Sequence, residues 1–188
     1  MNSFVMRTDA STSLNFLIYI QNIFLNQNRK ANKFKYPNFT LSPSFFKPNF
    51  ENRFKTLWSD VCQTIDKDVS NDFLLGDFYY QELFNSNEEN LQKFNEIRQS
   101  FQIWWDSLAG QFSIERSIDE QRDLLYQDLK ILFDKYNFSP EQVISVYVIY
   151  DDYVFETRLA TPYFIVASIN TFYIHYKNLL GEIEKMLI

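Results

Sequence analysis

Residues 161–188 constrain the fold more than any other stretch, because they are bulky and apolar with hardly a break. Thr161 and Pro162 are typical of a helix start, since threonine caps free backbone N–H groups and proline lacks an N–H that the first turn leaves unused. Apolar residues then recur at steps of three and four, which places them on one helical stripe: Ile165, Ile169, Phe172, Tyr176, Leu179, Ile183 and Leu187. The first half is apolar in the remaining directions too, and such a helix is normally buried on every side. The pattern predicts one central helix of about 27 residues, roughly 40 Å long.

Helix signals of the same kind divide most of the preceding chain. A first helix is predicted over 14–28, with Ser13 as its cap. Further helix starts are indicated by polar capping residues, namely Asn49, Ser70, Asn87, Ser117 and Ser139. Gly110 and Asn137 are predicted to end two of the helices. The sequence therefore predicts an all-α fold, with six or seven helices packed around a long C-terminal helix and an extended N-terminal arm.

Residues 143–157 fit two structures. Val143 to Tyr150 is rich in β-branched and aromatic residues, and Asp151-Asp152 can turn a hairpin into the residues that follow. In favour of a helix, the preceding Ser-Pro-Glu-Gln pattern is a strong helix start and the apolar residues keep helical spacing. We favour the helix and keep the hairpin as the alternative.

The composition bears on the setting more than on the chemistry. Phe, Tyr, Ile and Asn are frequent while Gly, Ala, Pro and Arg are scarce, as expected of an A/T-rich genome such as that of an organelle. Cys62 is the only cysteine, so no intrachain disulfide can form and an intracellular, reducing compartment is expected, the mitochondrion being one option. No stretch reaches the about 20 apolar residues of a membrane span, and residues 14–25 lack the flanks of a secretory signal.

The charges separate a basic arm from an acidic body. Between Asp9 and Glu51 there is no acidic residue, whereas residues 51–188 hold 23 of the 24 acidic residues and 12 of the 18 basic ones. Residues 32–48 contain three prolines and alternating aromatic and lysine residues, which predicts an extended arm. We therefore divide the chain into residues 1–48, holding a polar tail, a short helix and the arm, and a helical domain over 49–188.

Three roles are open for the arm. It can lie on its own acidic body, dock on another protein through aromatic anchors and steering lysines, or face a nucleic acid or anionic membrane surface. Nucleic acid is the weakest partner because the acidic body repels phosphates, while peripheral membrane contact stays open. The residues expected to bind a partner, another protein subunit first of all, are Arg29, Lys30, Lys33, Phe34, Lys35, Tyr36, Phe39, Phe45, Phe46, Lys47 and Trp105.

Residues able to carry chemistry are sparse. His175 is the only histidine and Cys62 fits an apolar helix stripe, so we expect no catalytic residue, no metal site and no cofactor. Asp151, Asp152 and Glu156 form the most pointed acidic group, and on a helix Asp152 and Glu156 share a face that suits Mg²⁺. This one motif resembles the aspartate-rich helix motifs of all-α prenyl-transferring enzymes, and the resemblance implies a magnesium–diphosphate site.

These observations favour a non-enzymatic accessory subunit of a larger protein assembly, which docks through its arm and aromatic surface. One alternative is a free-standing acidic binding protein of the inhibitor or immunity type, which would cover a basic surface on its target. The other is a magnesium-dependent all-α enzyme that uses the acidic group after residue 150.

Overall fold

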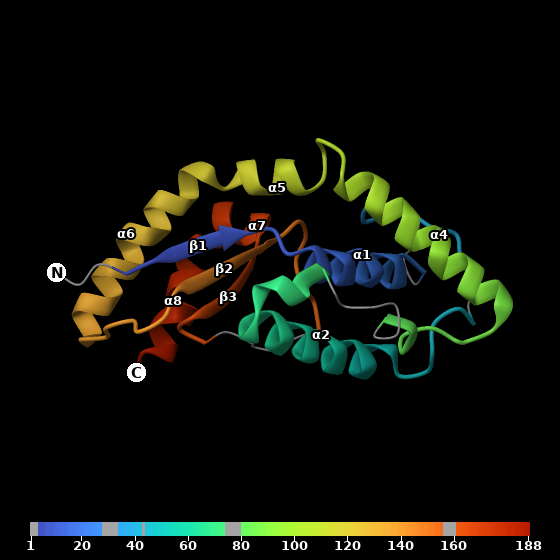
Figure 1. Cartoon of the computed structure of the whole chain (residues 1–188), viewed down its shortest axis with the longest axis horizontal. Coiled ribbons are helices and arrows are strands. Elements are labelled where there is room, and N and C mark those ends of the chain that lie inside the picture. Colours follow the sequence, from blue (N-terminus) through green and yellow to red (C-terminus); the bar gives the residue numbers. More distant parts are fainter. Residues whose placement is uncertain (1–3, 28–33, 43, 74–79, 156–160) are drawn as a thin grey trace. The chain divides into compact units, whose positions relative to one another are not determined.

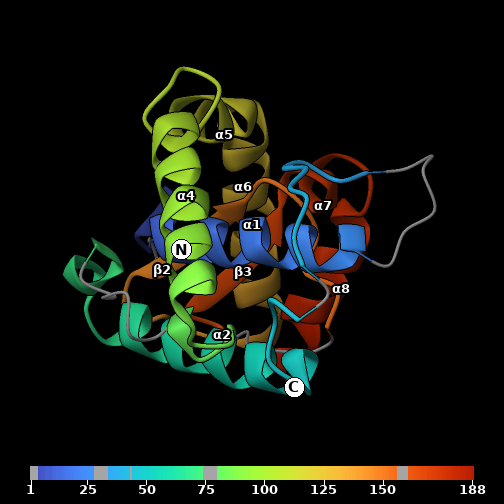
Figure 2. The ribbon, with the colours of Figure 1, turned by 90° about the vertical axis from the view of Figure 1, so that its right-hand side faces the viewer.

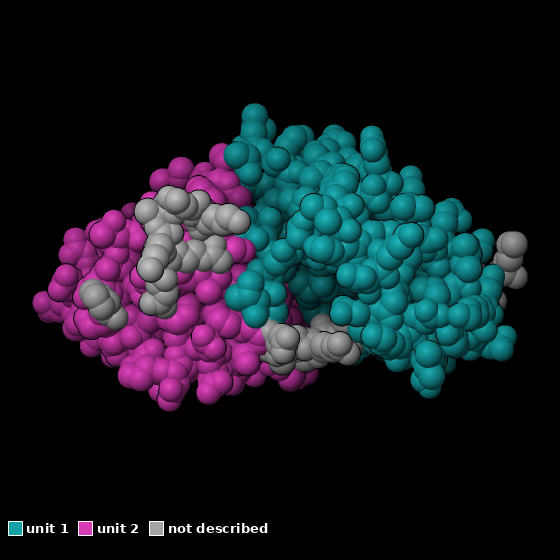
Figure 3. Space-filling model, turned by 180° about the vertical axis from the view of Figure 1, so that it is seen from behind, with its two compact units in different colours: residues 1–11, 108–154, 158–188 teal, residues 12–107, 155–157 magenta. Residues whose placement is uncertain are grey.

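The computed structural model describes residues 4–27, 34–42, 44–73, 80–155 and 161–188. The chain divides into two compact units, which Figure 3 distinguishes by colour. Unit 1 comprises residues 1–11, 108–154 and 158–188, and unit 2 comprises residues 12–107 and 155–157. The boundary expected after residue 48 lies inside unit 2.

Unit 2 is built around helix α1 (Thr12–Gln27), which is central and buried on almost every side. None of its 16 residues is charged, and Leu14, Leu17 and Ile18 are fully buried. The other elements of this unit are α2 (Phe50–Lys67), the 3-10 helix η1 (Val69–Phe73) and α4 (Glu88–Trp105). All three contact α1, and Figures 1 and 2 show α4 crossing α1 while α2 lies on its other side.

Aromatic side chains fill the core of unit 2. Phe54 of α2 is fully buried, with its ring centroid 5.5 Å from that of Phe50 and 5.2 Å from that of Phe155. On the α4 side, Phe101 lies 4.8 Å from Phe16 of α1 between ring centroids. Each such ring removes a large apolar area from water, and many of the aromatic residues of this unit lie in its core.

Unit 1 contains a three-stranded parallel sheet in the order β1-β2-β3. The strands are β1 (Met6–Asp9), β2 (Ile144–Ile149) and β3 (Phe164–Ser168). Arg7 pairs with Ser145, which in turn pairs with Phe164. The helices of this unit are α5 (Gln111–Ser117), α6 (Asp119–Tyr136), α7 (Ile169–Tyr173) and α8 (Tyr176–Met186). Among them, α5 contacts β2, and α6 contacts α8.

The all-α prediction is wrong, because unit 1 is mixed α/β. Residues 143–157 were expected to form a helix or a hairpin, and their described part, residues 143–155, forms neither: β2 ends at Ile149 and runs parallel to β3. Ile144 and Val148 are fully buried, and the whole strand is a nearly continuous apolar run. Such runs are typical of central strands in parallel sheets, and here that pairing prevails over a local helix-start pattern.

The predicted central C-terminal helix is wrong for a related reason. Residues 161–188 contain β3, the short α7 and the 11-residue α8 rather than one helix, while the longest α-helices, α2, α4 and α6, have 18 residues each. A short run that is apolar on all sides fits a buried strand as well as a buried helix, and spacing alone does not separate the two. The helical stripe is real only from Ile169 onward.

The polar tail also has structure. Residues expected to be a tail form β1, and just before it Phe4 stacks on Tyr126 of α6 with ring centroids 4.5 Å apart. The Tyr126 hydroxyl donates to the Phe4 carbonyl oxygen at 3.3 Å. These contacts lie more than 120 residues apart in sequence, so no local pattern indicates them.

Several capping predictions are confirmed and others are wrong. Asn87 precedes α4 and its side chain accepts a hydrogen bond from the Asn90 N–H, and Asn137 ends α6 in the left-handed region with φ 51°. Asn49 precedes α2 as predicted but makes no side-chain cap bond. Ser117 is the last residue of α5 rather than the cap of α6, and Ser139 starts no helix.

Candidate interaction surface and polar pocket

The described part of the arm lies on its own unit. Two side chains of α1 hold its backbone: the Asn22 amide donates to the Tyr36 carbonyl at 2.9 Å, and the Asn26 amide donates to the Lys35 and Pro37 carbonyls at 2.7 and 2.9 Å. The Lys35 N–H donates back to the Asn26 amide oxygen at 2.9 Å. These hydrogen bonds hold the arm backbone on α1, which has no charged residue. The first of the three roles considered for the arm, contact with the acidic body, describes Lys47, which pairs with Glu82.

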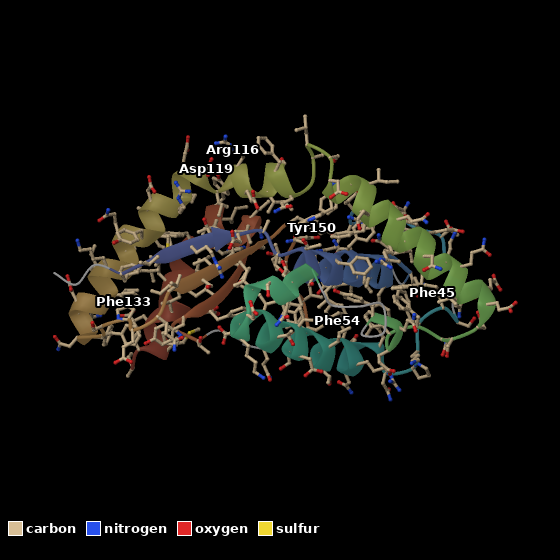
Figure 4. The ribbon with its side chains drawn as sticks, in the orientation of Figure 1. Phe45, Phe54, Arg116, Asp119, Phe133 and Tyr150 are labelled. Atoms are coloured by element: carbon tan, nitrogen blue, oxygen red, sulfur yellow. The ribbon has the colours of Figure 1, made fainter. Side chains whose placement is uncertain are left out.

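Several side chains expected to contact a partner lie inside unit 2. Phe45 and Phe46 are buried, and Phe46 forms a β-bridge with Phe84. Trp105 is also buried, with its ring centroid 5.4 Å from that of Phe101. Figure 4 labels Phe45 among the elements of unit 2. These three residues are core residues in this structure, and they offer a partner no surface.

The remaining predicted residues differ in exposure. Phe34 and Tyr36 are about half exposed, at 49% and 50%. Lys35 and Phe39 are half-buried, and Lys47 forms an ion pair with Glu82 at 3.4 Å. The three basic residues Arg29, Lys30 and Lys33 lie outside the described residues.

Tyr36 lines a groove along α4 with a volume of about 470 Å³. The other walls include Ile103, which is 74% exposed, and the half-buried Trp104, whose ring centroid lies 5.4 Å from that of Tyr36. At its base Tyr19 shares a 3.0 Å hydrogen bond with Ser100, and burial raises the pKa of Tyr19 to about 12. Burial also raises the pKa of Tyr36. Both phenols are therefore neutral at physiological pH, so the groove presents uncharged aromatic surface.

Trp105 was expected to contact a partner, but it is buried, and its neighbour Trp104 lines the groove instead. The buried positions of α4 end in the step Phe101 to Trp105, which is as regular a helical spacing as Phe101 to Trp104. Ile103 was missed, because an exposed isoleucine carries no signal in a single sequence.

The acidic group after β2 has a structural role in unit 1. Asp152 accepts hydrogen bonds from the Ser168 hydroxyl and, at 2.8 Å, from the Asn170 amide, so it fastens the loop after β2 to the start of α7. Asp151 accepts from the N–H of Asp152 at 2.8 Å. Glu156 lies outside the described residues, and Asp152 lies in the loop after β2 rather than on the expected helix. Among the described residues no grouping of histidine, cysteine and carboxylate side chains suits a metal ion.

The single histidine and the single cysteine have no features of a reactive site. His175 is exposed and occupies the position before α8. Cys62 is buried in α2, and burial raises the pKa of its thiol to about 12, so the thiol stays protonated and unreactive near neutral pH.

Unit 1 holds a second hollow, a polar pocket of about 230 Å³ at the carboxyl ends of β1 and β2. Thr8 and Asp9 of β1 and Val148 of β2 form its floor, and α5 and the first turns of α6 form its walls. Figure 4 labels Arg116 and Asp119 on these two helices. Ligands in parallel α/β structures bind preferentially outside the carboxyl ends of the strands.

Ion pairs cross the wall of the polar pocket. Arg116 lies 3.0 Å from the Asp119 carboxylate, and Arg122 lies 4.0 Å from the other oxygen of the same group. Glu115 accepts a hydrogen bond from Gln111 at 2.9 Å. These residues were not singled out from the sequence, although the i, i+3 spacing of Arg116, Asp119 and Arg122 is a signal for neighbouring charges on one helical face.

No described helix is long and apolar enough to cross a membrane. Comparisons of the chain with models of known protein families, with curated proteins and with solved structures find no match.

Proposed function

We propose that the protein is a non-enzymatic accessory subunit of a larger protein assembly, and that it docks through the groove of unit 2 lined by Tyr36, Ile103 and Trp104. The observation that carries this proposal is the exposure of these bulky apolar side chains around one hollow. Aromatic residues are enriched in the cores of protein interfaces, and contiguous exposed apolar surface of this kind marks interaction sites.

The arm is held in place before any partner arrives. Asn22 and Asn26 form hydrogen bonds with the backbone at Tyr36 and on both sides of it, and the Tyr36 ring contacts that of Trp104. A side chain that is already ordered loses little conformational entropy on binding, and this saving raises affinity without any new contact.

The chemistry of the groove favours a protein segment as its occupant. Its walls combine two aromatic rings with Ile103, while Glu96, Gln99 and Ser107 supply a polar rim. An apolar anchor surrounded by hydrogen-bonding groups is the usual composition of a protein interface. We therefore expect a partner that inserts an apolar side chain and pairs polar groups around it.

The test is the native size of the tagged protein in gentle extract, measured for a groove variant and a matched control. Ile103→Glu places a charge in the groove, and Ile131→Glu makes the same change on α6 at an isoleucine that is 64% exposed. The wild-type and Ile131→Glu proteins should elute in one high-mass peak with constant companions. Ile103→Glu should elute near the monomer mass, because loss of an interface anchor costs about 2 kcal/mol or more of binding free energy.

Two outcomes would contradict the proposal. Elution of the wild-type protein near its monomer mass would remove the assembly and favour the free-standing acidic binding protein. Equal behaviour of the two isoleucine variants would show that the assembly uses another surface. Circular dichroism of both purified variants establishes that each is folded.

A further inference from the structure

The polar pocket of unit 1 offers a site that is independent of the proposed docking groove. Its position follows from the strand register: Thr8 pairs with Val146, so Thr8 and Val148 lie on the same face of the sheet, near the carboxyl ends of their strands. α5 contacts β2 and, with α6, supplies the charged walls. The strand ends and the charged walls together create a hollow with polar groups on several sides.

The charges of the polar pocket balance. Its lining holds two acidic residues, Glu115 and Asp119, and two arginines, Arg116 and Arg122. Asp9 also borders the polar pocket, but it follows Thr8 on β1, so its side chain points to the opposite face of the sheet, where its carboxylate lies 2.8 Å from Arg7. A simple anion would meet carboxylates here and a simple cation would meet guanidinium groups, so neither is well matched.

The ion pairs in the wall of the polar pocket can be replaced by ion pairs with a ligand at little cost. The side chains of Arg116, Asp119 and Arg122 are 68%, 43% and 48% exposed, and exposed ion pairs contribute little to stability. The contacts of Arg122 with Asp119 and with the exposed Asp123 are long, at 4.0 and 3.6 Å. Arg122 can therefore turn to the carboxylate of a ligand, where it can form two parallel hydrogen bonds, without a large cost to the fold.

We propose that the polar pocket binds a small zwitterion of the amino-acid class. A guanidinium group of the pocket pairs with the carboxylate of the ligand, and a carboxylate of the pocket pairs with the ammonium group of the ligand. The volume of about 230 Å³ suits a ligand smaller than a typical drug molecule. Apolar walls from Phe112, Ile118 and Val148 accept an apolar part of the ligand.

The experiment is isothermal titration calorimetry of the full chain with a panel of single amino acids at millimolar concentration. Acetate and methylamine serve as half-ligands, and glycerol serves as a neutral polar probe. We expect at least one amino acid to bind, and each half-ligand to bind about tenfold more weakly or worse, because each lacks one charged hydrogen-bond partner.

Two variants locate the binding. Arg122→Gln and Glu115→Gln should each weaken the amino acid about tenfold. Lys130→Gln removes a positive charge from α6 outside the polar pocket and should leave binding unchanged. No heat of binding from any amino acid, glycerol binding as tightly as the amino acids, or unchanged affinity in both pocket variants would each overturn the proposal. None of these results bears on the docking groove, which belongs to unit 2 and is tested by native size.

Discussion

Asn26→Ala tests whether a buried asparagine holds the arm to unit 2. The Asn26 side chain is 5% exposed and makes three hydrogen bonds to the arm backbone, at 2.7, 2.9 and 2.9 Å. Truncation removes the partners of the Lys35 N–H and of the Lys35 and Pro37 carbonyl groups. Alanine is also a better helix former than asparagine, so the loss cannot come from α1 itself.

The expected magnitude follows from those three bonds. A hydrogen bond within a protein contributes about 0.5–1.5 kcal/mol net, and a buried polar group left unpaired costs about 1–3 kcal/mol. The bonds of Lys35 are partly buried, so its backbone groups can turn to water, while the bond to Pro37 is buried. We therefore expect a loss of about 2–3 kcal/mol in the free energy of unfolding, which lies within the about 1.5–4.5 kcal/mol to which three such bonds sum.

Urea unfolding followed by circular dichroism measures this loss, and hydrogen exchange of residues 34–37 measures the release of the arm. Asn38→Ala is the matched control, because Asn38 belongs to the same segment but is exposed. The control should change stability by less than about 0.5 kcal/mol. A loss equally small for Asn26→Ala, with unchanged exchange at residues 34–37, would refute the reasoning.

Three further predictions concern a core ring, a helix end and the buried thiol. Phe54→Ala should lower the free energy of unfolding by about 3–5 kcal/mol in a urea titration, whereas the half-exposed Phe34→Ala should change it by less than about 0.5 kcal/mol. Asn137→Gly should keep the thermal midpoint and Asn137→Ala should lower it, because the left-handed backbone at this position costs alanine about 1–2 kcal/mol while asparagine and glycine adopt it more readily. Burial raises the pKa of Cys62 from 9.0 to about 12, so the unfolded chain releases this proton first and stability should fall as pH rises above 9.0; urea midpoints of Cys62→Ala should lack that part of the pH dependence.

Local signals predicted the helices of unit 2 well. The cap at Asn87 and the first helix over residues 14–28 both correspond to helices in the structure, since each depends on interactions within one or two turns. The central role of α1 was less visible, although its 16 residues contain no charge. Asn22 and Asn26 within it are polar yet buried, because the arm backbone pairs with them.

The sheet of unit 1 could not be derived in the same way. β1 pairs with β2 across nearly 140 residues, and the intervening chain includes nearly all of unit 2. No turn or hairpin connects these strands, so none of the sequence signals that mark adjacent strands is present. The apolar run of β3 was visible, but its period does not distinguish a short buried strand from a buried helix.

The residues of the candidate interaction surface were also predicted only in part, because their burial depends on tertiary packing. Phe34 and Tyr36 are about half exposed, whereas Phe45, Phe46 and Trp105 are buried. All five residues are aromatic, so composition could not separate those in the core from those on the surface.

Tertiary pairing, rather than residue type, decides what each polar group in this chain does. Asp152 illustrates the point: in a helix it would have shared a face with Glu156, but at the end of a parallel strand it meets donors from Ser168 and Asn170 at the neighbouring strand end. Parallel strands bring their carboxyl ends to one edge whatever their separation in sequence, and the side chains that gather there acquire partners from distant segments. The same gathering places Thr8 and Val148 beside the charged residues of α5 and α6, so the polar pocket of unit 1 arises from a fold that the local pattern did not reveal.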